Sequence, residues 1–556
     1  MDTVTSVKRL PLGMNTFKQI IEENYVYSDK TKFVYDMASA GKSYFLSRPR
    51  RFGKSLLLSA FEALFSGPPD PDGPPHGLFK DLWIGRNSDY DFTMTYPIIT
   101  ISMAAGTKSP DELTLFLATA LSDINDKEKL NLTLTIPNID LRRIIEKLSE
   151  KYGKGVVVLI DEYDAPVSDN INNTELALKN GEILKDFYSG FKDTDKFLRF
   201  VLVTGITRYA FMGLSAGLNH LVDLTLNDNY SGIRGFTLSE FDECFSEHLP
   251  ILLRNMKQNS TVSNETTLSD LRDIILKYYD GYSWDGKTMI LNPISILNMF
   301  NESFFSRYWI QTNPSIYFLS KIAMENPLSL LGEESEKIST RTLSQAEVGS
   351  LGPIPSLFQT GYLTIDQVTH DADRFRVFTL KIPNLEVKDN NLFIFQRYLF
   401  NFLGREPAIE KNLFHDAIRN RDDGKLSRII NSVFASLPAE RHDDRESCYH
   451  KILYGYCHKF GRIVTPERKG AIGDSDPLVI FSDGLYAAIE LKFDIGQSIP
   501  GQERLVARLA KMALSSIDAK DYWRPYQAEA KELVKIGLGV SWRGQCLALI
   551  GNEEKN

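Results

Sequence analysis

The sequence is poor in the features that mark secreted proteins, zinc ribbons and membrane proteins. It contains 4 cysteines, and no two of them form a Cys-x-x-Cys pair, so we predict reduced thiols and no zinc ribbon. No run of about 18 apolar residues occurs, which argues against a membrane-spanning helix. The first residues also lack the apolar segment of a secretory signal. We therefore expect a cytoplasmic location and no membrane partner.

An excess of positive charge is also lacking. The formal net charge is −8, from 64 Lys and Arg against 72 Asp and Glu. This balance excludes a strongly basic protein that coats DNA, but it is compatible with a local basic groove. Hydrophobic residues make up 43% and charged residues 24% of the chain, as in ordinary globular proteins. A chain of 556 residues is too long for one core, so we predict several domains.

The first part of the chain alternates between strand-like and helix-like patterns. Strands are predicted from short apolar runs at 43–47, 96–102, 156–160 and 200–204. Helices are predicted at 55–65 and 141–152. Continuous apolar runs are typical of central strands in a parallel sheet that is buried on both faces. We predict an α/β domain with a doubly wound parallel sheet over residues 1–240.

The remaining chain changes character twice. Residues 241–390 are predicted to be a mainly helical lid or accessory domain, with short strands at 362–365 and 374–380. Residues 391–437 are predicted to be a helical linker, because helical patterns cover 390–403 and 410–437. Residues 438–556 are predicted to form a last α/β domain with a helix, a hairpin and a second helix.

A basic, glycine-containing turn separates the first predicted strand from the helix that follows it. The turn ends in Gly53-Lys54-Ser55, in the strand–turn–helix context of a phosphate-binding loop. Backbone N–H groups of such a loop bind phosphate oxygens, the lysine reaches the β- and γ-phosphates and the serine binds Mg²⁺. We predict that ATP contacts this turn, at Arg51, Phe52, Gly53, Lys54, Ser55 and Leu56. A second such triplet, at 41–43, precedes a strand and is discounted.

The turn departs from the general pattern at its first position. Arg48 stands five residues before Gly53, where a glycine is expected. An arginine there must change the path of the loop or point outward. A basic turn that merely caps a helix is the alternative interpretation of the same residues.

Two carboxylates end the third predicted strand. Asp161 and Glu162 follow the run Val156–Ile160, as expected of a strand that serves an ATP site. We predict that Asp161 holds Mg²⁺ together with Ser55, and that Glu162 polarises the attacking water. An acidic surface loop is the alternative. Thr207 or Arg208, at the end of the next strand, is a candidate sensor of the γ-phosphate.

The last domain contains a predicted hairpin with carboxylates on both strands. Asp483-Gly484 is a strong turn signal, and a turn centred there places Asp476 opposite Glu490. Lys492 lies two residues after Glu490, so both point to the same face. We predict a metal site at Asp476 and Glu490, with Lys492 positioning water. A surface hairpin with an ordinary Glu–Lys pair is the alternative. Glu446, on the preceding predicted helix, is a further candidate ligand.

Motifs along nearly the whole chain resemble the AAA-ATPase-like family of prokaryotic proteins. In the first half these motifs are Leu10-Pro-Leu-Gly, Tyr27-Ser-Asp-Lys-Thr, Arg48-Pro-Arg-Arg-Phe-Gly-Lys-Ser, Leu159-Ile-Asp-Glu-Tyr-Asp164 and Gly235-Phe-Thr. Later ones are Tyr279-Asp-Gly-Tyr282, Asn292-Pro293, Tyr308-Trp309, Gln359-Thr-Gly-Tyr-Leu-Thr364 and Ile382-Pro-Asn384. In this family the missing first glycine is usual, so Arg48 departs from the general loop and not from the family.

The last domain resembles the PD-(D/E)xK nuclease module that is typically fused to this family. The resemblance implies a restriction-endonuclease-like fold with functional residues at Asp476, Glu490, Lys492 and Glu446. Two positions depart from the family pattern. Asp474 stands where an arginine is usual, and Ser516 stands where a glutamine is usual, before Lys520 and Tyr522.

Two classes of function follow from these patterns. The first is a Mg²⁺-dependent ATPase coupled to a nuclease that cuts DNA or RNA, with homo-oligomers possible. The alternative is a nucleotide-dependent switch or scaffold whose last domain binds nucleic acid or a partner without cutting. A small-molecule kinase fits less well, because such kinases rarely need so long a lid and an appended domain.

Overall fold

The structure is a computed structural model. It describes residues 7–67, 77–104, 109–170, 173–208, 211–218, 220–311, 319, 330–331, 337–344, 352–436, 446–464, 478–480, 484–494, 502–520, 530–541 and 544–551. The chain divides into two compact units. Unit 1 takes the described residues up to 314 and those of 335–387, and unit 2 takes those of 315–334 and 388–556. The three predicted boundaries between domains, at 240/241, 390/391 and 437/438, stay predictions.

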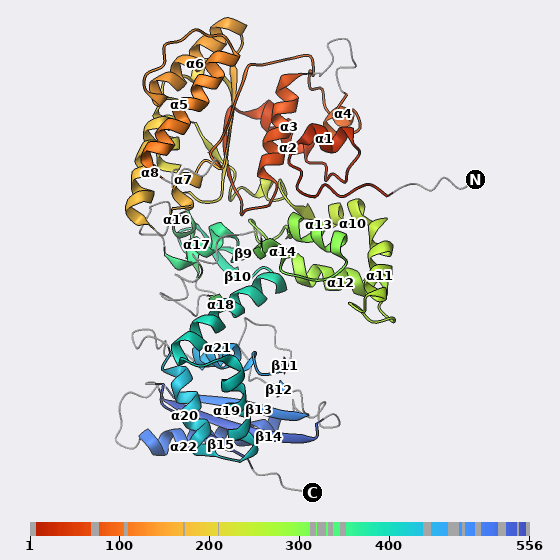
Figure 1. Cartoon of the computed structure of the whole chain (residues 1–556), viewed down its shortest axis with the longest axis vertical. Helices are drawn as coiled ribbons and strands as arrows, with labels where there is room; N and C mark the ends of the chain where they lie inside the picture. The colour runs from red at the N-terminus through yellow and green to blue at the C-terminus, as the bar shows by residue number, and fades with distance from the viewer. Residues whose placement is uncertain are drawn as a thin grey trace, which may run out of the picture. The chain divides into compact units, whose positions relative to one another are not determined.

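A five-stranded parallel sheet forms the centre of unit 1 (Figure 1). Its strands lie in the order β2-β3-β4-β1-β5. Their bounds are β1 Ser43–Ser47, β2 Ile98–Ser102, β3 Val156–Asp161, β4 Leu198–Gly205 and β5 Val222–Asp223. The four predicted strands are thus confirmed, and the short β5 was not predicted. Because all strands run in parallel, the ends of β1, β3 and β4 meet at one edge of the sheet.

Strand β3 shows why this sheet is buried on both sides. Val156, Val158 and Ile160 belong to one hydrophobic cluster, and Val157 and Leu159 belong to another. Helices α5 (Pro110–Lys127), α6 (Pro137–Tyr152) and α8 (Thr174–Ser189) cover the first face, whereas α2 (Thr31–Ala40) and α3 (Lys54–Ser66) cover the second (Figure 1). The apolar runs of the sequence therefore reflect helices on both faces.

Helices predominate in the part of unit 1 after residue 237. They include α10 (Leu238–Phe245), α11 (His248–Gln258), α12 (Leu268–Tyr279), α13 (Pro293–Glu302), α14 (Tyr308–Gln311) and α17 (Pro353–Thr360). A three-stranded sheet accompanies them, with β8 (Ile338–Ser339), β10 (Arg376–Lys381) and β9 (Thr364–His370) in that order. Asn292 starts α13 by accepting a hydrogen bond from the Ile294 N–H at 3.1 Å, as is typical of an N-cap.

The helices of unit 2 correct one prediction. After α18 (Leu385–Leu403), the single helix predicted over 410–437 is two helices, α19 (Pro407–Arg419) and α20 (Asp423–Phe434). Arg421 between them has a φ of 53°, which ends a right-handed helix. Asp422 then starts α20, since its carboxylate accepts a hydrogen bond from the Lys425 N–H at 2.8 Å.

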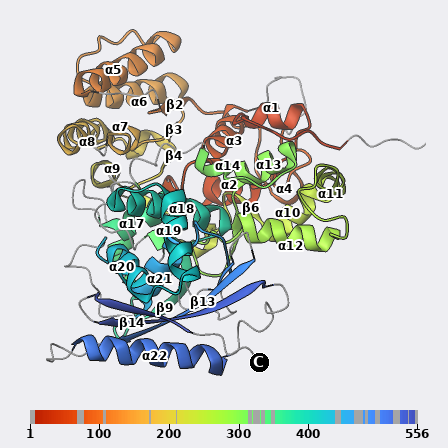
Figure 2. The ribbon, with the colours of Figure 1, turned by 60° about the horizontal axis from the view of Figure 1, so that its bottom comes forward.

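Unit 2 also contains a five-stranded sheet, in the order β11-β12-β13-β14-β15. The strands are β11 (Arg462–Val464), β12 (Leu478–Ile480), β13 (Leu485–Asp494), β14 (Glu532–Ser541) and β15 (Cys546–Ile550). Only β13 and β14 pair in parallel, and helix α22 (Gln502–Lys520) connects them. Figure 2 shows α22 along one face of this sheet and α20 and α21 (Glu446–Cys457) over the other.

The sequence pattern missed strands β11, β14 and β15. Strand β14 contains Gly537 and Gly539, and glycine lowers the preference for a strand. The reason for glycine is the close approach of α22: a Cβ atom at Gly537 would lie 2.2 Å from the carbonyl oxygen of Ala510, and one at Gly539 would lie 2.0 Å from that of Val506. The glycines thus let α22 pack directly on the strand.

Two expected absences concern membranes and disulfides. Among the described helices, none combines the length and the apolar character that crossing a bilayer requires. No disulfide joins Cys244, Cys448, Cys457 or Cys546 in the described part of the chain.

Candidate nucleotide-binding site

The predicted phosphate loop lies between β1 and α3, at the sheet edge where β3 and β4 also end. Gly53 immediately precedes α3 and has a φ of 80°, and Arg51 has a φ of 67°. Glycine adopts such left-handed backbone without cost, whereas arginine is strained there by roughly 1 kcal/mol. The path of the loop is therefore imposed by its surroundings and not by local preference.

Side chains bind the carbonyl groups of this loop. The ammonium group of Lys54 donates to the carbonyl oxygens of Arg48 at 2.9 Å and Pro49 at 3.0 Å. The indole N–H of Trp309 donates to the carbonyl oxygen of Arg50 at 2.9 Å. The guanidinium of Arg234 donates to the carbonyl oxygen of Gly53 at 2.7 Å. A loop that binds an anion must turn its carbonyls away from the anion and offer its N–H groups. The contacts from Trp309 and Arg234 hold the carbonyls of Arg50 and Gly53 in that way without Lys54, which leaves Lys54 free to bind a phosphate instead.

Arg48 points into the protein, so of the two predicted alternatives, a changed loop path or an outward side chain, the outward side chain is wrong. Its side chain is 1% exposed. The guanidinium donates to the carbonyl oxygens of Ser47 at 2.8 Å, Thr225 at 3.0 Å and Tyr230 at 3.2 Å, and it lies 4.1 Å from the ring centre of Trp284. Burial lowers the pKa of Arg48 to about 9, so the group keeps its charge at neutral pH. Arg48 thus supports the loop from behind.

Ser55 and Asp161 meet as the two predicted magnesium ligands. The Ser55 hydroxyl donates to Asp161 Oδ2 at 2.5 Å. The other carboxylate oxygen of Asp161 accepts from the Thr204 hydroxyl at 2.6 Å and from the Glu162 N–H at 3.0 Å. The Asp161 carboxylate therefore links the start of α3 to the ends of β3 and β4. Hard oxygen donors of this kind, in a largely buried position, fit Mg²⁺.

Glu162 faces the same side as the loop. It contributes to the wall of the cavity described below, together with Lys54 and Ser55. Its backbone φ is 50°, a strained value that turns the chain sharply at the end of β3. Burial raises the pKa of Glu162, and the neighbouring charge of Asp161 raises it further. A carboxylate with a raised pKa is suited to accept a proton from water.

Asp164 organises the end of β4, a role that sequence analysis did not assign. Its carboxylate accepts from the N–H of Ile206 at 3.1 Å and from the N–H and hydroxyl of Thr207 at 2.7 and 2.5 Å. The side chain is fully buried, and burial raises its pKa. The Asp164–Thr207 contact fixes the turn that carries the predicted γ-phosphate sensors.

Arg208 contacts β5 and the segment around Gln359. Its guanidinium forms an ion pair with Asp223 of β5. Its backbone N–H donates to the side-chain oxygen of Gln359 at 3.1 Å. Arg208 does not appear among the described residues that line the cavity beside the loop. Its role as a sensor stays a prediction.

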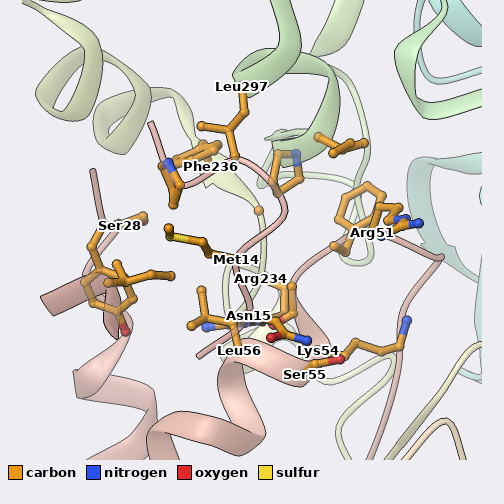
Figure 3. Close-up of a pocket in the computed structure, with 18 of the residues that line it drawn as sticks. Met14, Asn15, Ser28, Arg51, Lys54, Ser55, Leu56, Arg234, Phe236 and Leu297 are labelled. Carbon is orange, nitrogen blue, oxygen red and sulfur yellow. Dashed lines mark hydrogen bonds between the residues drawn. The ribbon is translucent and has the colours of Figure 1, made fainter. Parts of the chain in front are cut away.

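A cavity of about 350 Å³ adjoins the phosphate loop (Figure 3). Residues 50–56 and Glu162 form one end of it. Apolar side chains from three separate segments form much of the remaining wall: Met14, Ile20, Val26, Phe236, Ile294 and Leu297. Asn15, Ser28 and Lys30 add polar groups to this wall. A cavity with a phosphate-binding end and a mainly apolar wall fits a nucleotide.

Arg234 was also missed by sequence analysis. It is 4% exposed and lies on the cavity wall beside Lys54 and Asn15 (Figure 3). Burial lowers the pKa of Arg234. The neighbouring motif Gly235-Phe-Thr carried the family resemblance, but nothing in the sequence connects it with a loop 181 positions earlier.

In unit 2, strand β13 carries two of the residues predicted for the nuclease. Glu490 is 0% exposed, and the ammonium group of Lys492 lies 3.0 Å from Glu490 Oε1. In the register of β13 and β14, Glu490 pairs with Gly537 and Lys492 with Gly539. Paired residues share a face, so Glu490 and Lys492 lie on the side that α22 covers.

Of the other two predicted nuclease residues, the structure describes only Glu446. Asp476 lies outside the described residues, although the pairs up to Leu478–Ala488 follow the predicted register. Glu446 begins α21, and its Oε1 lies 3.6 Å from His450 Nε2. Helix α21 covers the opposite face, since its Tyr449 packs on Phe493 with ring centres 5.3 Å apart. Among the described residues, no group of three His, Cys, Asp or Glu could hold a metal ion.

Comparison with known proteins supports the nucleotide site. A family model described as "Predicted AAA-ATPase" matches residues 11–215. A protein of Azotobacter chroococcum mcd 1, named as an uncharacterized protein in the vnfD 5' region, is 30% identical over 549 residues, which cover 96% of this chain and 97% of that protein. The chain belongs to the AAA-ATPase-like family. The AAA-ATPase match contains the phosphate loop, Asp161, Glu162 and Asp164. Arg234, Trp309 and unit 2 lie beyond it.

Proposed function

We propose that this AAA-ATPase-like protein binds ATP with Mg²⁺ at residues 50–56 and hydrolyses it. The observation that carries the proposal is the contact between Ser55 and Asp161 at 2.5 Å, with Glu162 beside it on the wall of the same cavity. A nucleotide switch needs only Ser55 and Asp161 to hold the metal, whereas hydrolysis also needs a group that activates water. Glu162 supplies that group, which favours hydrolysis.

Each residue of the site has a defined task in this proposal. The N–H groups of the loop and the ammonium group of Lys54 bind the phosphates, once Lys54 exchanges the carbonyls of Arg48 and Pro49 for phosphate oxygens. Ser55 and Asp161 would hold Mg²⁺, which when bound neutralises charge on the phosphates. Glu162 orients water and accepts its proton. The apolar wall around Met14, Phe236 and Leu297 receives the base.

Binding of MgATP to the intact chain tests the proposal. Lys54→Ala is expected to weaken binding, measured by calorimetry, by about a hundredfold, because a charge-assisted contact worth ~3 kcal/mol is lost. Lys18→Ala is the matched control, since Lys18 is 52% exposed on α1 (Phe17–Glu22). Unchanged affinity in Lys54→Ala would contradict the proposed site. Tight binding without phosphate release would favour the switch.

We propose as a second function that unit 2 hydrolyses nucleic acid phosphodiesters in a metal-dependent reaction. The specific observation is the buried Glu490 with Lys492 at 3.0 Å, on the central strand of a sheet in which α22 connects two parallel strands. A buried carboxylate is costly and is commonly retained for function. Glu490 would hold the metal with Asp476, and Lys492 would position the water.

Cleavage of a supercoiled plasmid and of single-stranded RNA, with Mg²⁺ or Mn²⁺, tests this second function. Glu490→Gln and Lys492→Ala should each lower cleavage about 10²–10³-fold. Glu532→Gln and Lys535→Ala on β14 are matched controls, because these side chains are 37% and 30% exposed. Cleavage that persists in both Glu490→Gln and Lys492→Ala would exclude the site. Binding of nucleic acid without cleavage would favour the scaffold.

A further inference from the structure

We infer that four residues of the helical part of unit 1 form a collar that positions the phosphate loop for nucleotide, and that Trp309 is its central positioning residue. The collar consists of Tyr282, Trp284, Trp309 and Gly361. This inference rests on the proposed ATP site. It assigns a shared task to three motifs for which the sequence alone predicted none: Tyr279-Asp-Gly-Tyr282, Tyr308-Trp309 and Gln359-Thr-Gly-Tyr-Leu-Thr364.

The first five residues of the phosphate loop are residues 48–52, and each of four of them is contacted by a different residue of the collar. The guanidinium carbon of Arg48 lies over Trp284, 4.1 Å from the centre of the Trp284 ring. Gly361 lies against Pro49, where a Cβ atom would approach the proline ring to 2.8 Å. The Trp309 indole binds the Arg50 carbonyl at 2.9 Å. Tyr282 packs edge-on against Phe52 with ring centres 4.9 Å apart.

The remaining residue of the five, Arg51, shows what the collar does. Its φ of 67° is unfavourable for an arginine, so the loop needs outside contacts to keep this shape. A trans peptide turns its C=O and N–H in opposite directions. The hydrogen bond from Trp309 to the Arg50 carbonyl therefore also fixes the direction of the Arg51 N–H. Contacts on both sides of the strained residue replace the flexibility that a glycine would otherwise give.

Trp309 is itself held by a buried carboxyl group. Its backbone N–H donates to Glu386 Oε1 at 2.7 Å, and the Ser295 hydroxyl donates to Glu386 Oε2 at 2.7 Å. Trp309 is 0% exposed and Glu386 is 1% exposed. Burying a carboxyl group costs free energy unless it is hydrogen-bonded. These bonds fix the position from which the indole reaches the loop, so Glu386 positions Trp309 and Trp309 positions the loop.

Two measurements on the intact chain test the collar. Trp309→Phe keeps an aromatic ring and removes the N–H donor. We expect the Kd for MgATP and the KM to rise about tenfold with kcat within about threefold, since one hydrogen bond to a shared binding loop is lost. Without nucleotide, amide hydrogen exchange in residues 50–55 should accelerate about tenfold.

A merely structural role would give a different result. In that case the melting temperature falls and fewer molecules bind, but the folded molecules keep the wild-type Kd and the wild-type exchange in residues 50–55, which would overturn the collar. Wild-type protein that binds no ATP would refute the proposed function and the collar's task with it. Wild-type binding that is lost in Lys54→Ala but unchanged in Trp309→Phe would overturn the collar alone.

A second variant keeps the test decisive if Trp309→Phe does not fold. Gly361→Ala inserts a methyl group against Pro49, and it should also raise the Kd severalfold. Gly153→Ala is its matched control: Gly153 has a φ of +62°, like the +92° of Gly361, but no atom lies within 4 Å of its added Cβ. Equal affinity in the two alanine variants would overturn the collar. Glu386→Ala should reproduce the effect, and Glu386→Gln, which keeps an acceptor for the Trp309 N–H, should restore affinity.

Discussion

The hydroxyl of Ser55 lies 2.5 Å from Asp161 Oδ2 and joins residues that are 106 positions apart in the chain. Because Asp161 would reach Mg²⁺ together with Ser55, we expect Asp161→Asn to lower the apparent Mg²⁺ affinity of ATP hydrolysis roughly 10–100-fold. Phosphate release measured over a Mg²⁺ titration gives this value. Asp195→Asn, at a side chain that is 72% exposed, is the control and should match the wild type. An unshifted Mg²⁺ midpoint in Asp161→Asn would remove Asp161 from the site.

Glu162→Gln should separate binding from hydrolysis. We expect phosphate release to fall about 10²–10⁴-fold, while the Kd for MgATP stays within about threefold. Burial, and then the charge of Asp161, raises the pKa of Glu162, and only the ionised form accepts a proton. Wild-type kcat/KM, which reports the ionisation of the free protein, should therefore rise with pH through this raised pKa, and the residual kcat/KM of Glu162→Gln should lack that step. A pH profile with the same shape in both proteins would contradict the role of base.

Arg48→Lys should destabilise the protein although the charge is conserved. A lysine offers one ammonium group in place of the planar guanidinium that binds three carbonyls and stacks on Trp284. We expect a loss of about 2–4 kcal/mol in the free energy of unfolding of unit 1, measured by urea titration. Arg86→Lys, at a side chain that is 63% exposed, should change it by less than about 0.5 kcal/mol. Equal effects of the two substitutions would refute a supporting role for Arg48.

Glu386 should make the stability of unit 1 depend on pH. Burial raises the pKa of Glu386 from its ordinary 4.5 to about 8. Between these values the folded state keeps a proton that the unfolded state releases, so this stabilisation is complete below pH 4.5 and is lost as pH rises towards 8. The slope is at most about 1.4 kcal/mol per pH unit. Urea titrations at pH 5.5 and 8 should show the decline in the wild type and a smaller one in Glu386→Gln.

The control for that experiment is another buried carboxyl group. Glu410 in unit 2 is 0% exposed but forms an ion pair with Arg405 at 2.7 Å. Glu410→Gln should leave the pH dependence of unit 1 as in the wild type. If Glu386→Gln also leaves it unchanged, the raised pKa of Glu386 is wrong.

Much of the ATP site follows from local sequence. Gly53, Lys54 and Ser55 stand between an apolar run and a helical pattern, and Asp161 and Glu162 end another apolar run. Since parallel strands end at one edge, these residues were expected to meet, and they do. In unit 2, the turn signal at 483–484 predicted the register of β12 and β13 that the described pairs show.

The tertiary structure alone decided what surrounds these residues. Trp309 lies 259 positions after Arg50 in the chain, and no periodicity connects them. The inward course of Arg48 depends on carbonyls of Thr225 and Tyr230, which come from a separate segment. Side-chain spacing determines helices, strands and the letters of a motif, because these depend on neighbours in the chain. The shape of the phosphate loop depends on contacts between distant segments, and only packing brings those together.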